Sequence, residues 1–267
     1  MRSWLFVPGS HGARIAKALD SAADAVIIDW EDGVAPADKA AARTTTAAAL
    51  SALSSRRPWL RINAHGDWHA DDLAAARELP LAGLVLPKAE SSEFCTRLAA
   101  AGWPLLLLIE TPLGVERAFD LACLPGVDWL GFGSLDYLAA IQGEYSVTGD
   151  TLNYARSRLI NAARAAGLSG VVDGAFVEYR DIEGLRAEAD LARRLGFDGK
   201  LLIHPGQIAP VHAALAPSAS DRDWARRLLD AWEASGAGGV ISLDGRMIDA
   251  PLVAAARTIL LRAGEPR

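Results

Sequence analysis

The chain has 267 residues, 51% of them hydrophobic, which is enough for one large domain with a sizeable core. Its formal charge of −6 and isoelectric point near 5.4 lack the basic excess of a nucleic-acid-binding protein, whose affinity depends on neutralising phosphates. The opening residues lack the apolar stretch and cleavage site of a signal peptide, and no apolar run has the length of a membrane span. We therefore expect a cytoplasmic protein whose partners are neither nucleic acids nor membranes.

Eight short runs rich in leucine and β-branched residues recur along the chain, and segments of helical composition such as 38–53, 90–101 and 181–195 alternate with them. Continuous hydrophobicity within each run indicates a strand buried on both faces. Eight such units predict an α/β fold of the closed kind, a (β/α)8 TIM barrel. The predicted strands are residues 4–7, 25–28, 59–62, 83–86, 105–109, 128–132, 170–172 and 200–203.

The βα rhythm ends after Pro217, so the barrel is expected to occupy residues 1–217 and a C-terminal helical extension residues 218–267. The sequence of the extension predicts, in order, a helix, a glycine-rich break, a short strand-and-turn piece and a final helix. The first three cover residues 221–234, 236–239 and 240–247. Such an extension packs against its own barrel or forms a subunit interface.

Acidic residues cluster where the predicted strands end, which in a barrel of this kind is the face that holds the active site. Carboxylates crowded at one rim raise one another's pKa values unless a cation lies among them. All the candidate donors are oxygens, without a His or Cys pair at ligand spacing, so a hard ion fits: Mg²⁺, with Mn²⁺ as the alternative. The acidic residues are Asp29, Glu31, Asp32, Glu110 and Asp136.

Within this set, Glu110 and Asp136 are the candidate metal ligands, because magnesium takes one or two carboxylates and fills its other positions with water and substrate oxygens. Arg61 follows the third predicted strand, where a guanidinium could clamp a carboxylate or steady a developing oxyanion. A salt bridge between Arg61 and a rim acid is the equal alternative. For Asp173 and His204, structural hydrogen bonds are the favoured roles.

Motifs along nearly the whole chain resemble the citrate lyase β-subunit-like family, whose relatives include the malyl-CoA and citramalyl-CoA lyases and the HpcH/HpaI aldolases. No single motif is specific, but their combination in this order is. The motifs are RSWLFVPG (2–9), DWED (29–32) with Lys39 and Arg43, RIN (61–63), LPK (86–88), IETP (109–112), GSLD (133–136), GKLLIHP (199–205) and MID (247–249).

The resemblance implies a Mg²⁺-dependent carbon–carbon lyase that cleaves a β-hydroxyacyl thioester into an acetyl-type thioester and an oxoacid by Claisen-type chemistry. It implies that Glu110 and Asp136 bind the metal and that Arg61 contacts substrate oxygens. Phe6 and Lys17 become contacts to the thioester carrier, which is coenzyme A or an acyl-carrier protein. The resemblance further implies that Asp29, Glu31 and Asp32 support the metal region, the last two by orienting metal-bound waters.

Asp249 is the candidate acid/base at the thioester carbon, since the rim acids are committed to the metal region. The resemblance implies that it comes from a neighbouring subunit of a homo-oligomer, a trimer or hexamer. Capping of the last helix, with Pro251 in its first turn, is the equal alternative.

Two departures from the family pattern, Trp30 and His11, leave the identity of the carrier open. Three other functions also remain open. They are a metal-dependent aldolase acting on free 4-hydroxy-2-oxoacids, a metal-free aldolase with a Schiff base on Lys88, and a barrel without catalytic activity.

Overall fold

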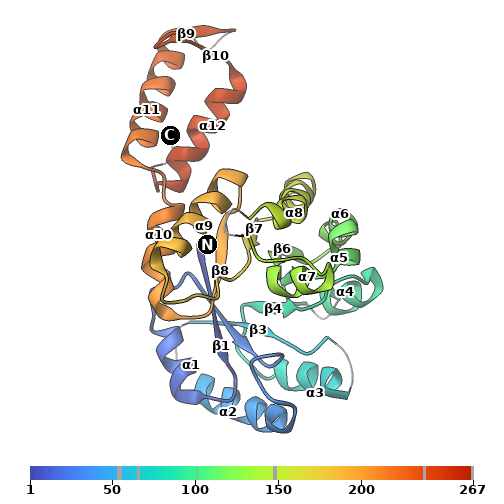
Figure 1. Cartoon of the computed structure of the whole chain (residues 1–267). Helices are drawn as coiled ribbons and strands as arrows, with labels where there is room; N and C mark the ends of the chain where they lie inside the picture. The colour runs from blue at the N-terminus through green and yellow to red at the C-terminus, as the bar shows by residue number, and fades with distance from the viewer. Residues whose placement is uncertain (53–55, 65–66, 101, 147–148, 237–238, 266–267) are drawn as a thin grey trace. The chain divides into compact units, whose positions relative to one another are not determined.

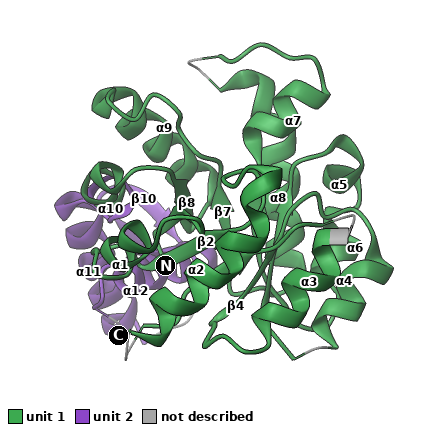
Figure 2. Ribbon diagram, turned by 90° about the horizontal axis from the view of Figure 1, so that it is seen from below, with its two compact units in different colours: residues 1–212 green, residues 213–267 purple. Residues whose placement is uncertain are grey.

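The computed structural model describes residues 1–52, 56–64, 67–100, 102–146, 149–236 and 239–265. The chain divides into two compact units, residues 1–212 and 213–267, which Figure 2 colours separately. Residues 237 and 238 of the predicted glycine-rich break lie outside the described residues, as do residue 53 and residue 101 at the ends of two predicted helices.

The first unit is a closed barrel of eight parallel strands with helices around its outside (Figure 1). Strands pair in chain order, and β8 closes the sheet against β1 with Trp4 opposite Leu201. The TIM barrel prediction is confirmed, with all eight strands within one residue of their predicted ends. The strands are β1 (Ser3–Pro8), β2 (Ala25–Asp29), β3 (Trp59–Arg61), β4 (Gly83–Leu86), β5 (Leu105–Ile109), β6 (Val127–Phe132), β7 (Gly170–Asp173) and β8 (Gly199–Leu202).

Local signals explain where several outer helices begin and end. The Asp181 side chain accepts a hydrogen bond from the Gly184 amide at the start of α9, and Gly196 ends that helix at a φ of 114°. The helices of this unit are α1 (Gly12–Leu19), α2 (Lys39–Ser51), α3 (Asp67–Ala76), α4 (Ser92–Ala99), α5 (Pro112–Glu116), α6 (Ala118–Ala122), α7 (Ser134–Ala140), α8 (Asn153–Ala165), α9 (Ile182–Leu195) and α10 (Ile208–Leu215), the last of which crosses into the second unit. Three short 3₁₀ helices also occur: η1 (Pro36–Asp38), η2 (Asp150–Leu152) and η3 (Pro205–Gln207).

Three tryptophan rings fill the interior of the barrel. Trp4 meets the rings of Trp59 and Trp129 edge-on, with centroid separations of 5.3 and 5.0 Å. Gly83 and Gly170 begin two other strands, and a Cβ at either position would collide with one of these rings. The large rings therefore occupy space that the glycines leave open, and the interior is packed rather than hollow.

A buried ionic cluster joins strands β7 and β8 to helices α8 and α9. The Asp173 carboxylate accepts hydrogen bonds from Arg156 Nε at 2.9 Å and from Lys200 Nζ at 2.8 Å, and all three side chains are buried. Lys200 also contacts Glu188 at 2.6 Å. Burial acts to raise the pKa of Asp173, but the charges of Lys200 and Arg156 outweigh it and hold that pKa below its ordinary value. The predicted structural role of Asp173 is confirmed.

The second unit has a hydrophobic core of its own. Helix α11 (Ala219–Ala234) packs against α12 (Ala250–Arg262), and a hairpin of β9 (Ile241–Leu243) and β10 (Arg246–Ile248) joins them. Trp232 and Ile248 belong to that core. Asp249 caps α12, because its side chain accepts a hydrogen bond from the Leu252 amide at 3.3 Å. The capping role that the sequence allowed for Asp249 is therefore confirmed.

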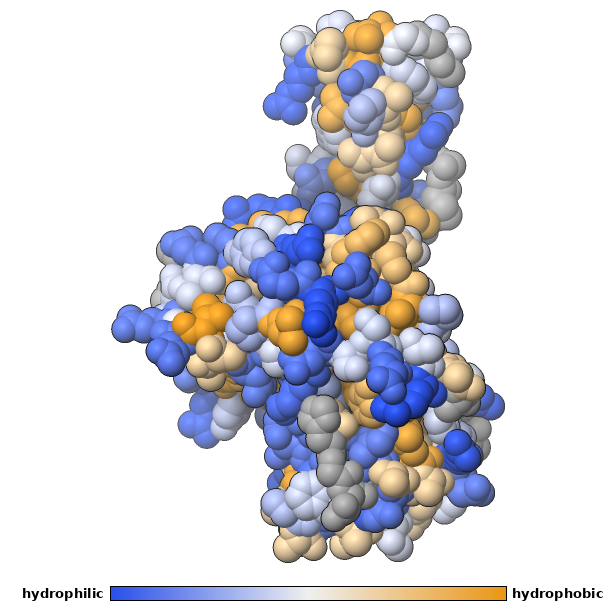
Figure 3. Space-filling model, turned by 90° about the vertical axis from the view of Figure 1, so that its right-hand side faces the viewer, coloured by the Kyte–Doolittle hydropathy of each residue, from blue (hydrophilic) through white to orange (hydrophobic). Residues whose placement is uncertain are grey.

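On the face drawn in Figure 3, charged and polar residues alternate with small apolar areas. Within the described ranges, no helix combines the length and the apolar character needed to cross a bilayer.

The ionic cluster predicts a large loss of stability in Asp173→Asn, because a neutral amide leaves the buried charges of Arg156 and Lys200 uncompensated. We expect a fall of about 3–5 kcal/mol in the free energy of unfolding at neutral pH, measured by urea denaturation. Asp190→Asn is the matched control, because Asp190 forms only surface ion pairs on α9, and a change of about 0.5 kcal/mol or less is expected. Equal stability of the two variants would show that the cluster does not stabilise the barrel.

Candidate active site

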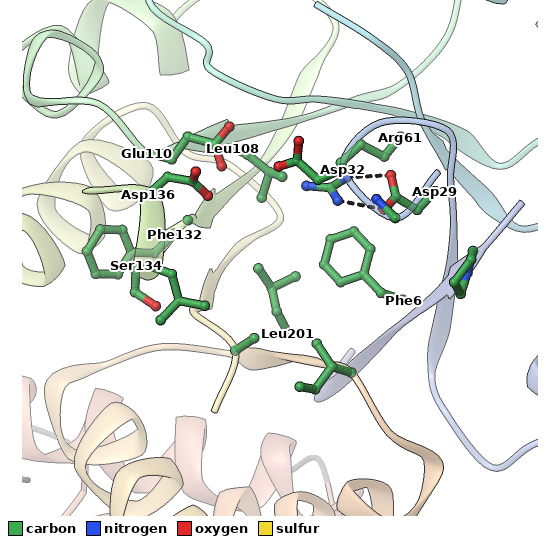
Figure 4. A pocket seen from close by; sticks show the side chains of 16 residues that line it. Phe6, Asp29, Asp32, Arg61, Leu108, Glu110, Phe132, Ser134, Asp136 and Leu201 are labelled. Carbon is green, nitrogen blue, oxygen red and sulfur yellow. Dashed lines mark hydrogen bonds and ion pairs between the residues drawn. The ribbon is translucent and has the colours of Figure 1, made fainter. Parts of the chain in front are cut away.

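A cavity of about 400 Å³ lies at the carboxyl ends of the barrel strands (Figure 4). Its floor is apolar and includes Leu108, Phe132 and Leu201. Six residues singled out from the sequence line it, namely Phe6, Asp29, Asp32, Arg61, Glu110 and Asp136. The barrel thus brings together residues that come from five different strand ends.

Arg61 is fixed on one side of this cavity by a two-pronged ion pair with Asp29. Its Nε and Nη2 groups donate to the two Asp29 oxygens at 2.7 and 2.6 Å (Figure 4). Its Nη1 lies 3.0 Å from a Glu31 oxygen. Burial acts to lower the pKa of Arg61, but the hydrogen bond and charge of Asp29 raise it above its ordinary value. The guanidinium also lies over the Phe6 ring, 4.8 Å from its centroid.

The turn after β2 is held in one conformation by the same aspartate. Asp29 accepts from the backbone amides of Glu31 and Gly33, each at 2.8 Å, in addition to its two bonds with Arg61. These four hydrogen bonds fill the acceptor positions of the carboxylate. Asp29 therefore positions Arg61 and the turn.

Lys39 supports this turn from the first residue of α2, although the sequence suggested no role for it beyond its place in a motif. Its Nζ donates to the backbone oxygens of Trp30 and Glu31, each at 2.8 Å. Burial lowers the pKa of Lys39, against the pull of Asp29 and other nearby carboxylates. The available signal in the sequence was a lysine that begins the helix following the acidic block.

Glu110 and Asp136 face each other on the opposite side of the cavity (Figure 4). Burial, followed by the charge of Asp136, raises the pKa of Glu110 to about 7, although the Lys88 amide donates to its Oε1 at 2.6 Å. In the part of the chain that the structure describes, neither carboxylate forms an ion pair. A Cβ at Gly133 would collide with the Glu110 side chain, so this glycine keeps the space open.

This pair suits a hard divalent cation in both donor type and number. The donors are carboxylate oxygens, and a cation between them would compensate both the burial and the charge of Asp136 that raise the pKa of Glu110. Among the described residues, no group of three or more His, Cys, Asp or Glu side chains could hold a metal. Two protein carboxylates still fit magnesium, which commonly keeps water and substrate oxygens in its other positions.

Lys17, which the resemblance implied, is exposed on α1 and does not line the cavity, and Asp249 belongs to the second unit. Glu31 borders the site through its contacts with Arg61 and with Lys88 Nζ, the latter at 2.5 Å. His204 has the predicted structural hydrogen bond, because its Nδ1 accepts from the Gly206 amide at 3.0 Å.

Trp30, one of the two departures from the family pattern, is fully buried and supports the loop after β1. Its Nε1 donates to Thr46, whose hydroxyl donates to the Gly9 carbonyl, and a Cβ at Gly9 would collide with the indole. His11, the other departure, is exposed and contacts the Ser10 hydroxyl at 2.8 Å. The Trp30 indole thus fits because residue 9 is a glycine and has no side chain.

Residues 2–205 match the HpcH/HpaI aldolase/citrate lyase family. The chain belongs to this family. A "Citrate lyase subunit beta-like protein" of Deinococcus radiodurans is 40% identical over 97% of this chain and 96% of its own length. A "(3S)-malyl-CoA thioesterase" of Cereibacter sphaeroides is 32% identical over 98% of this chain and 94% of its own. The family resemblance inferred from the sequence motifs is confirmed.

Solved structures of citrate lyase family members share this fold. The protein CitE of Mycobacterium tuberculosis, crystallised in complex with magnesium, acetoacetate and coenzyme A, superposes with a TM-score of 0.89. It is 37% identical, and the match covers 99% of this chain and 98% of that protein. Magnesium and a thioester carrier are therefore found together in a member of the family.

The facing carboxylates predict that Asp136→Asn lowers the pKa of Glu110 in metal-free protein, because one of the two charges that oppose its ionisation is removed. Burial remains, so the value should fall from about 7 without reaching the ordinary 4.5. A ¹³C NMR titration of labelled glutamate carboxyls in EDTA measures this shift. Asp120→Asn, at a residue on α6 that does not line the cavity, is the control. An unchanged Glu110 titration in Asp136→Asn would mean that the two groups do not interact.

Proposed function

We propose that this chain is a magnesium-dependent carbon–carbon lyase that cleaves a β-hydroxyacyl thioester into an acetyl-type thioester and an oxoacid. The observation that carries the proposal is the placement of two carboxylates that form no ion pair with any described residue, Glu110 and Asp136, opposite a fixed guanidinium, Arg61, in one cavity. Claisen-type cleavage needs a cation at the oxoacid oxygens and a donor for the charge that develops as the bond breaks. The cavity offers a place for both.

Glu110 and Asp136 would hold Mg²⁺, as the family member crystallised with magnesium supports. When bound, the ion supplies Lewis-acid polarisation of the oxoacid oxygens. Glu31 and Asp32 lie beside this position and would orient water molecules around it, whereas Asp29 acts on the same region by holding Arg61.

Arg61 would bind substrate oxygens with the two N–H groups that Asp29 and Glu31 leave unused. During cleavage the substrate hydroxyl gives its proton to water, the C–C bond electrons move to the carbon beside the thioester, and the hydroxyl carbon becomes the oxoacid carbonyl. The carbon beside the thioester leaves as an enolate, which is protonated in the next step. A guanidinium already locked by two carboxylates stabilises developing negative charge without reorganising. The apolar floor at Leu108 and Leu201 excludes water from the reacting carbon.

The enolate carbon must take up a proton, and we assign this step to Asp249 of a neighbouring subunit. The second unit, residues 213–267, contains the whole expected extension from residue 218 onward, and its own core allows it to keep its structure when it lies on another barrel. Only Oδ1 of Asp249 is used to cap α12 among the described residues, which leaves Oδ2 for proton transfer. This assignment requires a homo-oligomer, for which the family resemblance implies a trimer or hexamer.

Three alternatives use parts of the same site. An aldolase acting on free 4-hydroxy-2-oxoacids needs the same cation but no carrier, and a thioesterase is suggested by the name of one relative. A Schiff-base aldolase would need an uncharged Lys88. Although burial acts to lower the pKa of Lys88, the hydrogen bond and charge of Glu31 raise it above its ordinary value, which disfavours that chemistry.

A substrate panel tests the function directly. The purified protein is incubated with Mg²⁺ and malyl-CoA, citramalyl-CoA, a citryl thioester or free 4-hydroxy-2-oxoacids. Phenylhydrazine traps a released oxoacid, and a thiol reagent detects free carrier. We expect oxoacid release from at least one thioester without thiol release, and its loss in EDTA. Thiol without oxoacid would identify a thioesterase, and cleavage of the free acids alone would identify an aldolase.

Variants connect this activity to the facing carboxylates. Glu110→Gln should lower kcat/KM by roughly a hundredfold or more with an unchanged melting temperature, since a metal ligand is lost without a core cavity. Glu144→Gln, at an exposed residue outside the cavity, is the matched control and should be fully active.

Subunit mixing tests the position of Asp249. Glu110→Gln and Asp249→Asn subunits, each inactive alone, are unfolded together and reassembled in equal amounts. Half of the sites receive an intact Glu110, and half of those receive an intact Asp249 from the next subunit. Activity should therefore recover to about a quarter of wild type. Verified mixed oligomers that stay inactive would place Asp249 in its own subunit's site or outside the reaction.

A further inference from the structure

Lys88 combines an uncommon backbone conformation with contacts to two acidic residues of the active site. Its φ of 50° lies in the left-handed region, where the Cβ of an ordinary residue is crowded by its own backbone. Two other non-glycine residues of the described chain have such an angle. They are Gln142, which follows α7, and Asp244, in the hairpin turn between β9 and β10, and both are exposed. Lys88 differs from them because it contacts Glu110 and Glu31.

The sheet imposes this conformation on the turn that follows β4. The strand ends at Leu86, and the Ala89 amide donates to the Leu108 carbonyl of β5 at 3.1 Å. Only Pro87 and Lys88 connect these two anchored points, and proline restricts its own φ to negative values. The left-handed bend therefore falls on Lys88. Glycine would adopt this bend without steric cost, so a lysine here implies a use for its side chain.

The bend directs the Lys88 amide at one of the candidate metal ligands. This amide donates to Glu110 Oε1 at 2.6 Å. The other carboxylate oxygen, Oε2, lies next to Gly133, because a Cβ at Gly133 would collide with it. Gly133 and Asp136 belong to the same wall of the cavity. The backbone thus holds one oxygen of Glu110, and the second remains on the side of Asp136, where it is available to a cation.

The side chain of the same residue reaches the half of the site that contains Arg61. Lys88 Nζ contacts Glu31 Oε1 at 2.5 Å, and the other Glu31 oxygen lies 3.0 Å from Arg61 Nη1. Glu31 is thereby held between an ammonium and a guanidinium. A neutral side chain at position 88 would leave Glu31 in contact with Arg61 alone, and the orientation of both side chains would be less constrained.

We propose that Lys88 is a positioning residue that connects the two halves of the active site, through its amide to Glu110 and through its ammonium to Glu31 and Arg61. The inference rests on the proposed lyase function and adds a residue to the groups that support it. The two connections need different properties of Lys88. The amide connection needs the left-handed backbone, and the ammonium connection needs a positive charge on a long side chain. Substitutions can therefore separate them.

Metal affinity measures the amide connection without any turnover. Lys88→Asn loses the ammonium but keeps the left-handed backbone, which asparagine tolerates, whereas the β-branched side chain of Lys88→Val disfavours it. Electron paramagnetic resonance of free Mn²⁺ should show binding about tenfold weaker in Lys88→Val and within about twofold of wild type in Lys88→Asn. Gln142→Val is the matched control, because it places valine at a φ of 55° outside the cavity and should bind Mn²⁺ normally.

Chemical rescue measures the ammonium connection. Lys88→Asn should lower kcat at saturating Mg²⁺ about tenfold, because Glu31 and Arg61 are less well fixed in the transition state. Lys88→Cys should be equally impaired. Alkylation of its thiol with 2-bromoethylamine rebuilds an ammonium at nearly the length of lysine and should restore most of the activity. The exposed Cys123 is replaced by serine in this experiment, and Cys123→Ser treated with the same reagent is the control.

Equal Mn²⁺ affinity in wild type, Lys88→Asn and Lys88→Val would overturn the amide connection and leave the metal site in place. If circular dichroism shows Lys88→Val to be unfolded, Lys88→Ala makes the same comparison with a smaller expected loss. An alkylated Lys88→Cys that stays as slow as Lys88→Asn would overturn the ammonium connection. Weaker Mn²⁺ binding by Lys88→Val alone, in a protein that cleaves no thioester, would support the positioning of Glu110 and overturn the proposed function instead.

Discussion

Closure of the parallel sheet, through the hydrogen bonds that join β1 to β8, is the constraint on which the rest of this protein depends. A closed parallel barrel places every carboxyl end at one rim, so residues far apart in the chain become neighbours. Glu110 and Asp136 meet in this way after β5 and β6, opposite Arg61 on β3. The tryptophan rings fill the interior below, which leaves the rim as the place where a substrate can enter.

The charges at that rim divide into a compensated half and an uncompensated half. Asp29, Glu31, Arg61 and Lys88 neutralise one another through short ion pairs, so that half is rigid. Glu110 and Asp136 have no such partner among the described residues, and burial, followed by the charge of Asp136, raises the pKa of Glu110. The ion-paired half positions a hydrogen-bond donor, Arg61, for the substrate. The like charges of Glu110 and Asp136 instead favour the binding of a cation.

Support for the site extends outward through further hydrogen bonds. Lys39 and the Trp30 indole hold the segments on either side of the acidic turn, and Gln207 connects the end of β8 to the loop after β7. These hydrogen bonds hold neighbouring segments of the chain rather than substrate, and none of the three residues lines the cavity. The second unit differs, because its core is complete in itself and its Asp249 is presented at a helix N-terminus.

The sequence by itself determined the barrel, the boundaries of its strands and the identity of the rim acids, because strands buried on both faces leave continuous apolar runs that end in polar residues. Only the tertiary structure decided which charges pair. Asp29 bonds Arg61 because the register of β2 against β3 sets these two residues opposite each other, and register depends on hydrogen bonds across the sheet rather than on local composition. The same holds for the opening that Gly133 leaves beside Glu110 and for the contact between Tyr179 and His204. These arrangements join different strand ends, so they exist only after the barrel has closed.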